Sequence, residues 1–265
     1  VKSDTGYSQV ASNAQQPNFI RDFDEIAIRN FASSSFDAFG SVTYQRDMLN
    51  SRNSSNISVD LFWRPDASKQ LSVALNPDFG QVESDKLVVN FSPYETFFSE
   101  RRAFFTENQA LFDVQGNAGL RLVHTRRAGV DGDINAAVKY TQNSQHTDFG
   151  VMAVFEDDSR GSDEANRFAT VRTQHRFDHS QIGYLLTYSA KAHMERKAQV
   201  HTVDFKSDVS DSVQISGLLS GSFIDLTSAN EHSEGLGGQL NVVHKFSDNW
   251  QQSFSFTRFS DDYDV

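Results

Sequence analysis

The residues best suited to ionic chemistry lie in one short stretch of the chain. Three glutamates flank the pair Arg101-Arg102, among several phenylalanines. A guanidinium group is planar and can bind a carboxylate through two parallel hydrogen bonds, whereas so many charges facing lipid would carry a large energetic cost. We therefore expect a charge network inside a lumen, made of Glu95, Glu100, Arg101, Arg102 and Glu107.

Oxygen-bearing side chains also gather just before this stretch, at Asp78, Gln81, Glu83 and Asp85. Carboxylate and amide oxygens are the ligands that hard cations prefer, so these four residues form a candidate ligand or cation site. Two interpretations of the region remain open. Its charges either pair to hold the structure together, or they bind a cation at the acidic residues or an anionic ligand at the two arginines.

Signatures of the common enzyme and cofactor classes are missing. The sequence has no nucleophile elbow, Walker loop, zinc-protease helix or dinucleotide fingerprint, and it has no cysteine. We expect no cofactor and no metal. A hydrolase acting on envelope glycans or lipids remains an alternative, with Glu95 and Glu100 as its acid/base candidates.

The composition restricts the fold. Of 265 residues, 38% are hydrophobic and 23 are phenylalanine, which argues against disorder and against a bundle of apolar membrane helices. The net charge of −11, with no run of Lys or Arg, argues against a nucleic-acid partner.

Alternation with a period of two is the dominant pattern. Ile57, Val59 and Leu61 alternate with Ser58, Asp60 and Phe62, as in a strand with one apolar face. The same pattern recurs along the chain. We predict an all-β chain of about thirteen strands. Their approximate ranges are 36–48, 56–63, 69–76, 86–91, 117–127, 133–141, 148–156, 167–177, 181–190, 199–207, 213–224, 238–246 and 250–259.

The lengths of the connections distinguish between β architectures. From residue 142 onward, short connections (142–147, 178–180, 207–211, 247–249) alternate with long ones (157–166, 191–198, 225–237). This rhythm is typical of a transmembrane up-and-down antiparallel β-barrel, which has tight turns on one side of the membrane and longer loops on the other. A soluble β-sandwich is the competing interpretation. A mean hydropathy of −0.51 is compatible with the barrel, because only alternate side chains face lipid.

We expect three parts in the chain: an N-terminal periplasmic or lumenal segment (1–35), barrel strands (36–265), and a plug-like lumenal insert (92–116). With short turns placed in the periplasm, strand 250–259 runs outward and residues 261–265 begin an external loop. Because single-chain bacterial barrels have even numbers of strands, thirteen strands predict an incomplete part of a larger barrel.

Residues 76–105 also resemble a known family. The runs Asn76-Pro-Asp-Phe-Gly-Gln-Val-Glu-Ser-Asp85, Tyr94-Glu-Thr-Phe-Phe98 and Ser99-Glu-Arg-Arg102, followed by Thr125-Arg-Arg-Ala-Gly129, are similar to the hallmark motifs of a bacterial outer-membrane barrel family of unknown function (domain of unknown function 5916). That family is often found downstream of a family-9 carbohydrate-binding-like domain. This sequence departs from the pattern at Ser99 and Ala103, where prolines are usual, and at Thr106, where an aliphatic residue is usual.

The resemblance implies an outer-membrane barrel but supplies no reaction. We expect a pore, export partner or conducting scaffold in the outer membrane of a Gram-negative bacterium, with a transport role. A docking scaffold for soluble partners is a further alternative. The expected partners are outer-membrane lipid and lipopolysaccharide, other envelope proteins, and a chain that supplies the missing strands.

Overall fold

The computed structural model describes residues 2–3, 6–7, 34–47, 52–77, 100–114, 116, 120–130, 132–157, 165–247 and 249–264. The chain divides into two compact units, 1–32 and 33–265. In the first unit, β1 (Lys2–Ser3) pairs with β2 (Gly6–Tyr7). The second unit contains all the structure discussed below.

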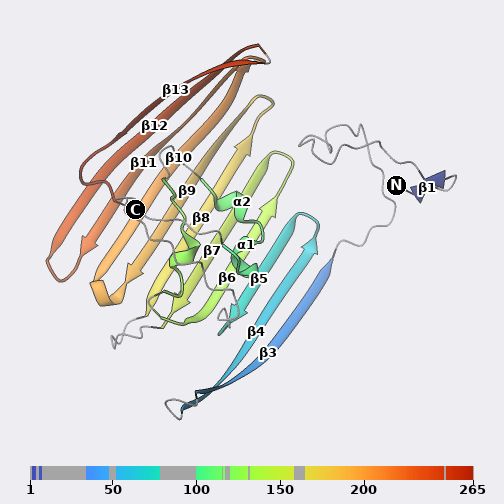
Figure 1. Cartoon of the computed structure of the whole chain (residues 1–265), viewed down its shortest axis with the longest axis vertical. Coiled ribbons are helices and arrows are strands. Elements are labelled where there is room, and N and C mark those ends of the chain that lie inside the picture. Colours follow the sequence, from blue (N-terminus) through green and yellow to red (C-terminus); the bar gives the residue numbers. More distant parts are fainter. Residues whose placement is uncertain are drawn as a thin grey trace. The chain divides into compact units, whose positions relative to one another are not determined.

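Eleven strands of the second unit form one antiparallel sheet, in which every strand pairs with its neighbours in the sequence (Figure 1). This up-and-down order confirms the predicted all-β fold class. The strands are β3 (Ser35–Asp47), β4 (Arg52–Asp66), β5 (Lys69–Leu75), β6 (Ile134–Asn143), β7 (Thr147–Glu156), β8 (Asn166–Arg176), β9 (Ser180–Lys191), β10 (Arg196–Ser210), β11 (Val213–Leu226), β12 (Glu231–Ser247) and β13 (Trp250–Phe259).

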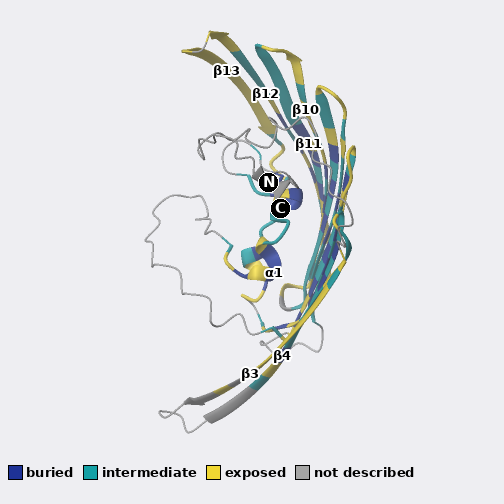
Figure 2. Ribbon diagram, turned by 90° about the vertical axis from the view of Figure 1, so that its right-hand side faces the viewer, coloured by how far each residue is buried: buried dark blue, intermediate teal, exposed yellow. Residues whose placement is uncertain are grey.

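The sheet is curved (Figure 2), and the residues on its two faces differ sharply in polarity. Side chains on the face that we call the outer face are large, apolar and exposed, for example Ile57 (66%), Leu219 (59%) and Phe256 (64%). Their strand neighbours point to the opposite, inner face, where many buried side chains are small or polar. Ser72, Lys139, Thr141, Thr170, Thr202, Ser220 and Ser222 are all at most 2% exposed there.

The alternation of connection lengths is present, although two long connections are shorter than predicted. The strand ends lie close together between β6 and β7, β8 and β9, β10 and β11, and β12 and β13, and farther apart in sequence between β7 and β8, β9 and β10, and β11 and β12. The difference arises because the flanking strands continue beyond their predicted ends: β10 begins at Arg196 and β12 at Glu231. A short helical turn, η5 (Ala192–Met194), occupies one of these connections.

One excursion interrupts the up-and-down order, between β5 and β6. These two strands pair directly over seven register positions, from Lys69 opposite Gln142 to Leu75 opposite Ala136. The backbone N–H of Asn76 donates to Asn135 O (2.7 Å), so both ends of the excursion start from adjacent points of the sheet.

The described part of the excursion contains α1 (Ala103–Thr106), α2 (Gln109–Phe112) and η4 (Thr125–Arg127). The predicted strand at 117–127 is wrong over its described residues, 120–127, because the pairing of β5 with β6 leaves no place for another strand between them. The predicted strand at 86–91 lies outside the described residues. No helix among the described residues is both long enough and apolar enough to cross a bilayer.

Residues 260–264 also differ from expectation, because they fold over the inner face where an external loop was predicted to begin. The hydroxyl of Tyr263 donates to Ser220 Oγ (2.8 Å), and the backbone N–H of Asp264 donates to Ser222 Oγ (3.2 Å). Arg196 forms an ion pair with Asp264 (2.9 Å). This segment therefore covers part of β11 from the inside.

Candidate functional site: the inner face and the segment that occupies it

The concave side of the sheet is occupied by residues 100–114, 116 and 120–130, which we call the inner segment (Figure 2). Its phenylalanines form the centre of an apolar cluster. Phe104, Phe105 and Phe112 are each at most 3% exposed and belong to the same cluster as Met152 and Val154 of β7. A second cluster joins Val114 and Leu122 of the segment to Leu185 and Val200 of the sheet. The segment is thus held to the sheet by burial of apolar side chains.

The segment is also tied to itself by an ionic clamp. Arg102 Nε and Nη2 donate to the two carboxylate oxygens of Glu100, at 2.9 and 2.7 Å. The same guanidinium donates to Thr125 O and Ala128 O, both at 2.7 Å, while the Thr125 hydroxyl donates to Glu100 Oε2 (2.8 Å). The clamp therefore joins the start of the described segment to its 125–128 turn, and both side chains are at most 9% exposed.

Burial and hydrogen bonding act in opposite directions on Glu100. Burial alone raises the pKa of its carboxyl group, but the hydrogen bonds and charge of Arg102, with the Thr125 hydroxyl, lower that pKa below its ordinary value of 4.5. Glu100 is therefore ionised at neutral pH. An ionised carboxylate whose two oxygens already accept several hydrogen bonds is poorly suited to the acid role of a hydrolase.

Of the other members of the predicted charge network, only Glu107 and Arg101 lie among the described residues. Glu107 pairs with Arg64 of β4 (2.6 Å), and not with either neighbouring arginine. Arg101 is exposed, and its backbone N–H donates to Glu100 Oε1 (3.0 Å). Glu95 lies outside the described residues, as do all four residues of the predicted ligand or cation site, Asp78, Gln81, Glu83 and Asp85. Among the residues that are described, no three His, Asp or Glu side chains form a potential metal site.

Lys139 of β6 is an anchor that the sequence analysis missed. Its side chain points to the inner face, where its ammonium group donates to Phe104 O and Glu107 O (the latter at 2.5 Å) and lies 5.0 Å from the Phe104 ring centroid. It thereby satisfies carbonyl groups near the end of α1 that have no helical partner. The signal in the sequence was a lysine at an inner-face position of the alternating strand, between Ala137 and Thr141.

A glycine allows the segment to approach the sheet closely. A Cβ atom added to Gly150 of β7 would lie 2.6 Å from Phe112 Cζ and 2.7 Å from Leu111 Cδ2. Both distances are far below ordinary carbon–carbon contact. Only a residue without a side chain lets α2 sit against β7 in this way.

Together these features define a fold of the outer-membrane β-barrel type: an up-and-down antiparallel sheet, apolar outside and polar inside, with chain held against its inner face. Residues 35–152 match the family described as a domain of unknown function, DUF5916. The match confirms the resemblance expected from the motifs between residues 76 and 129, and it contains both the excursion and the strands on either side of it. It defines no activity.

Solved structures to which the chain is similar include outer-membrane proteins. For OmpT of Vibrio cholerae folded in vitro, the identity is 10%, the coverage is 86% of this chain and 85% of that chain, and the TM-score is 0.38. For the same protein expressed in the outer membrane, the identity is 10%, the coverage is 88% of this chain and 90% of that chain, and the TM-score is 0.36. For a mutant of the porin of Rh. blastica, the identity is 9%, the coverage is 84% of this chain and 85% of that chain, and the TM-score is 0.33. Comparison with curated proteins gives no match. Function is therefore inferred from the chain's own residues.

Proposed function

We propose that this chain forms part of an outer-membrane β-barrel that acts as a pore or conducting scaffold, with the inner segment as its plug. The observation that carries the proposal is the reversed polarity of the sheet. Charged and hydroxyl side chains such as Lys139, Arg172 and Thr202 are buried on the inner face, while large apolar side chains are exposed across the outer face. In water so extensive an apolar surface would be a severe liability, whereas acyl chains would cover it favourably.

The strands also suit a bilayer. From β6 to β13 they contain 10 to 17 residues, enough for a tilted crossing. Their backbone groups are satisfied by neighbouring strands, as hydrocarbon requires. We expect outer-membrane lipid, including lipopolysaccharide, to be the partner of the outer face.

The two edge strands support a further partner. In the described sheet β3 pairs only with β4, and β13 only with β12. Inside hydrocarbon, an edge whose N–H and C=O groups have no partner would cost several kcal/mol per group. We propose that strands from elsewhere in the same protein, or from another envelope protein, pair with β3 and β13 and complete the barrel.

Membrane insertion is tested by an arginine scan with a matched position. Leu219 lies at the middle of β11 on the outer face, whereas Val209 lies at the end of β10 beside a tight turn. Leu219→Arg should lower the free energy of unfolding in lipid vesicles by about 2–4 kcal/mol, and Val209→Arg by about 0–1 kcal/mol, because the cost of a cation falls away from the bilayer midplane. Equal effects at the two positions, measured by urea titration, would contradict a transmembrane orientation.

Conduction is tested separately, in planar bilayers. Protein with the intact inner segment should give small or infrequent conductance steps, and a variant lacking residues 100–128 should give larger ones, because the segment occupies the concave side of the sheet. A variant with Ser228 and Ala229 of the β11–β12 connection replaced by glycine is the control and should leave conductance as in the unmodified protein. Absence of conductance from both intact and segment-deleted protein, when each is folded and inserted, would rule out the pore.

A further inference from the structure

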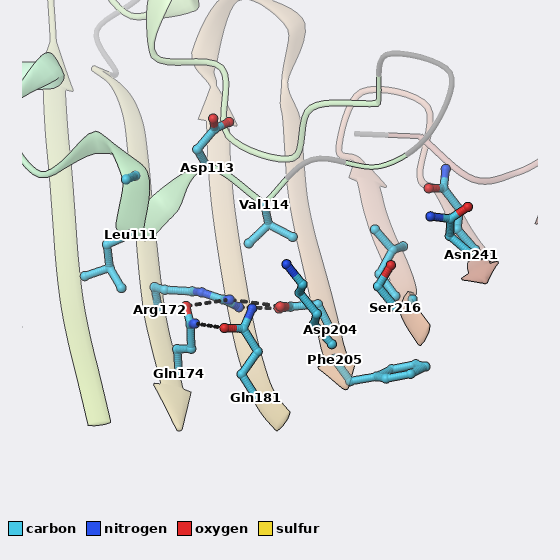
Figure 3. Close-up of a pocket in the computed structure, with 15 residues that line it drawn as sticks. Leu111, Asp113, Val114, Arg172, Gln174, Gln181, Asp204, Phe205, Ser216 and Asn241 are labelled. Carbon is cyan, nitrogen blue, oxygen red and sulfur yellow. Dashed lines mark hydrogen bonds and ion pairs between the residues drawn. The ribbon is translucent and has the colours of Figure 1, made fainter. Parts of the chain in front are cut away.

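A second polar feature lies on the inner face (Figure 3), and none of the clamp residues lines it. It is a trough of about 360 Å³ between residues 110–114 of the inner segment and the inner face of β8 to β12. Its volume falls within the usual range for small-molecule sites. The ionic clamp and the Lys139 anchor described above use none of its floor residues.

The floor consists of two adjacent rows of cross-strand neighbours. In the first row, Gln174, Gly183, Asp204, Leu218 and Gln239 lie opposite one another from β8 to β12. In the second row, Gln181, Lys206, Ser216 and Asn241 do so from β9 to β12. With neighbouring strands about 4.8 Å apart, the trough presents polar groups over roughly 20 Å. That length suits an extended ligand better than a single ion.

The first row is organised by an arginine that crosses a strand. The guanidinium of Arg172 reaches from β8 over Gly183 of β9 and binds both carboxylate oxygens of Asp204 on β10. A Cβ atom at Gly183 would lie 2.4 Å from each of two guanidinium nitrogens, so a glycine is required for this path. The Arg172 side chain is only 3% exposed, and its Nε–H has no hydrogen-bond partner among the described residues.

The charges in the trough balance. The Arg172–Asp204 pair is internally neutral, and the lining contains one further basic residue, Lys206, and one further acidic residue, Asp113, so its formal charges sum to zero. The remaining polar groups are amides and a hydroxyl, and Gln174 Nε2 already donates to Gln181 Oε1 (2.9 Å). An amide both donates and accepts hydrogen bonds, as a sugar hydroxyl does. A trough with no surplus of either charge favours neither an anion nor a cation.

A small apolar area completes the lining. Leu111 and Val114 of the inner segment and Leu218 of β11 line the same trough. Sugar rings present hydroxyl groups at their edges and C–H groups on their faces, so they need both kinds of surface. We propose that this trough is a binding site for a short neutral oligosaccharide, held by Gln174, Gln181, Asp204 and Asn241.

The proposal is tested by isothermal titration calorimetry on the folded chain in detergent, with maltotriose, cellotriose and chitotriose as neutral probes and trigalacturonate as an acidic one. At least one neutral probe should bind with a Kd of about 10 mM or tighter. Gln181→Ala and Asn241→Ala should each weaken that binding about tenfold, the effect expected when a ligand hydrogen bond is lost. Gln199→Ala, at an exposed position on the outer face of β10, is the matched control and should change nothing.

Gly183→Ala provides a second variant, because its methyl group should displace Arg172 from Asp204 and also weaken binding. If that variant fails to fold, the two amide variants still decide the question. Failure of every neutral probe to bind, equal binding by all variants, or tighter binding of trigalacturonate would each overturn the proposal. Because the measurement needs no bilayer, a negative result here is independent of the conductance result.

Discussion

Replacing Arg102 by alanine should separate the start of the inner segment from its 125–128 turn and lower the free energy of unfolding by about 3–5 kcal/mol, the usual cost of removing one partner from a buried ion pair. The Glu100 side chain is only 1% exposed, so the substitution leaves a buried carboxylate without its counter-charge. It also removes the donors to Thr125 O and Ala128 O. Urea titration of the folded protein, together with limited proteolysis of residues 100–130, measures both effects.

Arg167→Ala is the control for this experiment. It removes an arginine side chain from an exposed position at the start of β8, and it should change stability by no more than about 0.5 kcal/mol. Arg102→Lys should recover only part of the loss, because an ammonium group cannot bind two carboxylate oxygens and two carbonyls in a plane. Equal stability of the two alanine variants would show that the clamp does not hold the segment.

Replacing Phe112 by alanine should have an effect of similar size, about 3–5 kcal/mol, because it removes a buried aromatic side chain and leaves a cavity. Phe112 is 3% exposed and contacts the bare backbone of Gly150. Gly150→Ala should by itself cost about 1–3 kcal/mol by overpacking the same contact. The free energies of unfolding of the two single variants are the measurement.

The double variant provides the sharper test. In Phe112→Ala combined with Gly150→Ala, the new methyl group enters space that the ring has vacated, so the two losses should sum to more than the loss in the double variant. If the losses of stability in the two single variants simply add up in the double variant, the Phe112 ring and Gly150 do not interact. That result would contradict the docking of α2 on β7.

The strands were largely predictable because their signal is local. In β4, β9 and β10, apolar residues recur at every second position, and a period of two needs no knowledge of the partner strand. The signal for the short turns is also local, because the chain must reverse direction where the alternation of apolar and polar residues stops. The ends of β10 and β12 were not predictable, because Arg196 and Glu231 join the sheet through pairing with β9 and β11, not through their own propensities.

The site was only partly predictable, for the same reason. Glu100 and Arg102 are two residues apart, and the charge pattern placed them in one network. Glu107, by contrast, pairs with Arg64 across 43 positions of sequence, which no spacing rule reveals. The roles of Gly150 and Gly183 depend on what lies above each glycine in space, which the sequence of its own strand does not specify.

The direct pairing of β5 with β6 has a consequence for how this chain can change. Because Asn76 and Asn135 meet at the sheet, everything between them is a side loop whose length has no bearing on strand register, and doubling such a loop adds only about 0.6 kcal/mol of closure entropy. The excursion can therefore change in length without shifting the register of β5 against β6. A graft that keeps the residues docked on the inner face, such as Phe104 and Phe112, should leave the surrounding wall intact, whereas one that removes them would leave Lys139 and the apolar side chains of β7 uncovered.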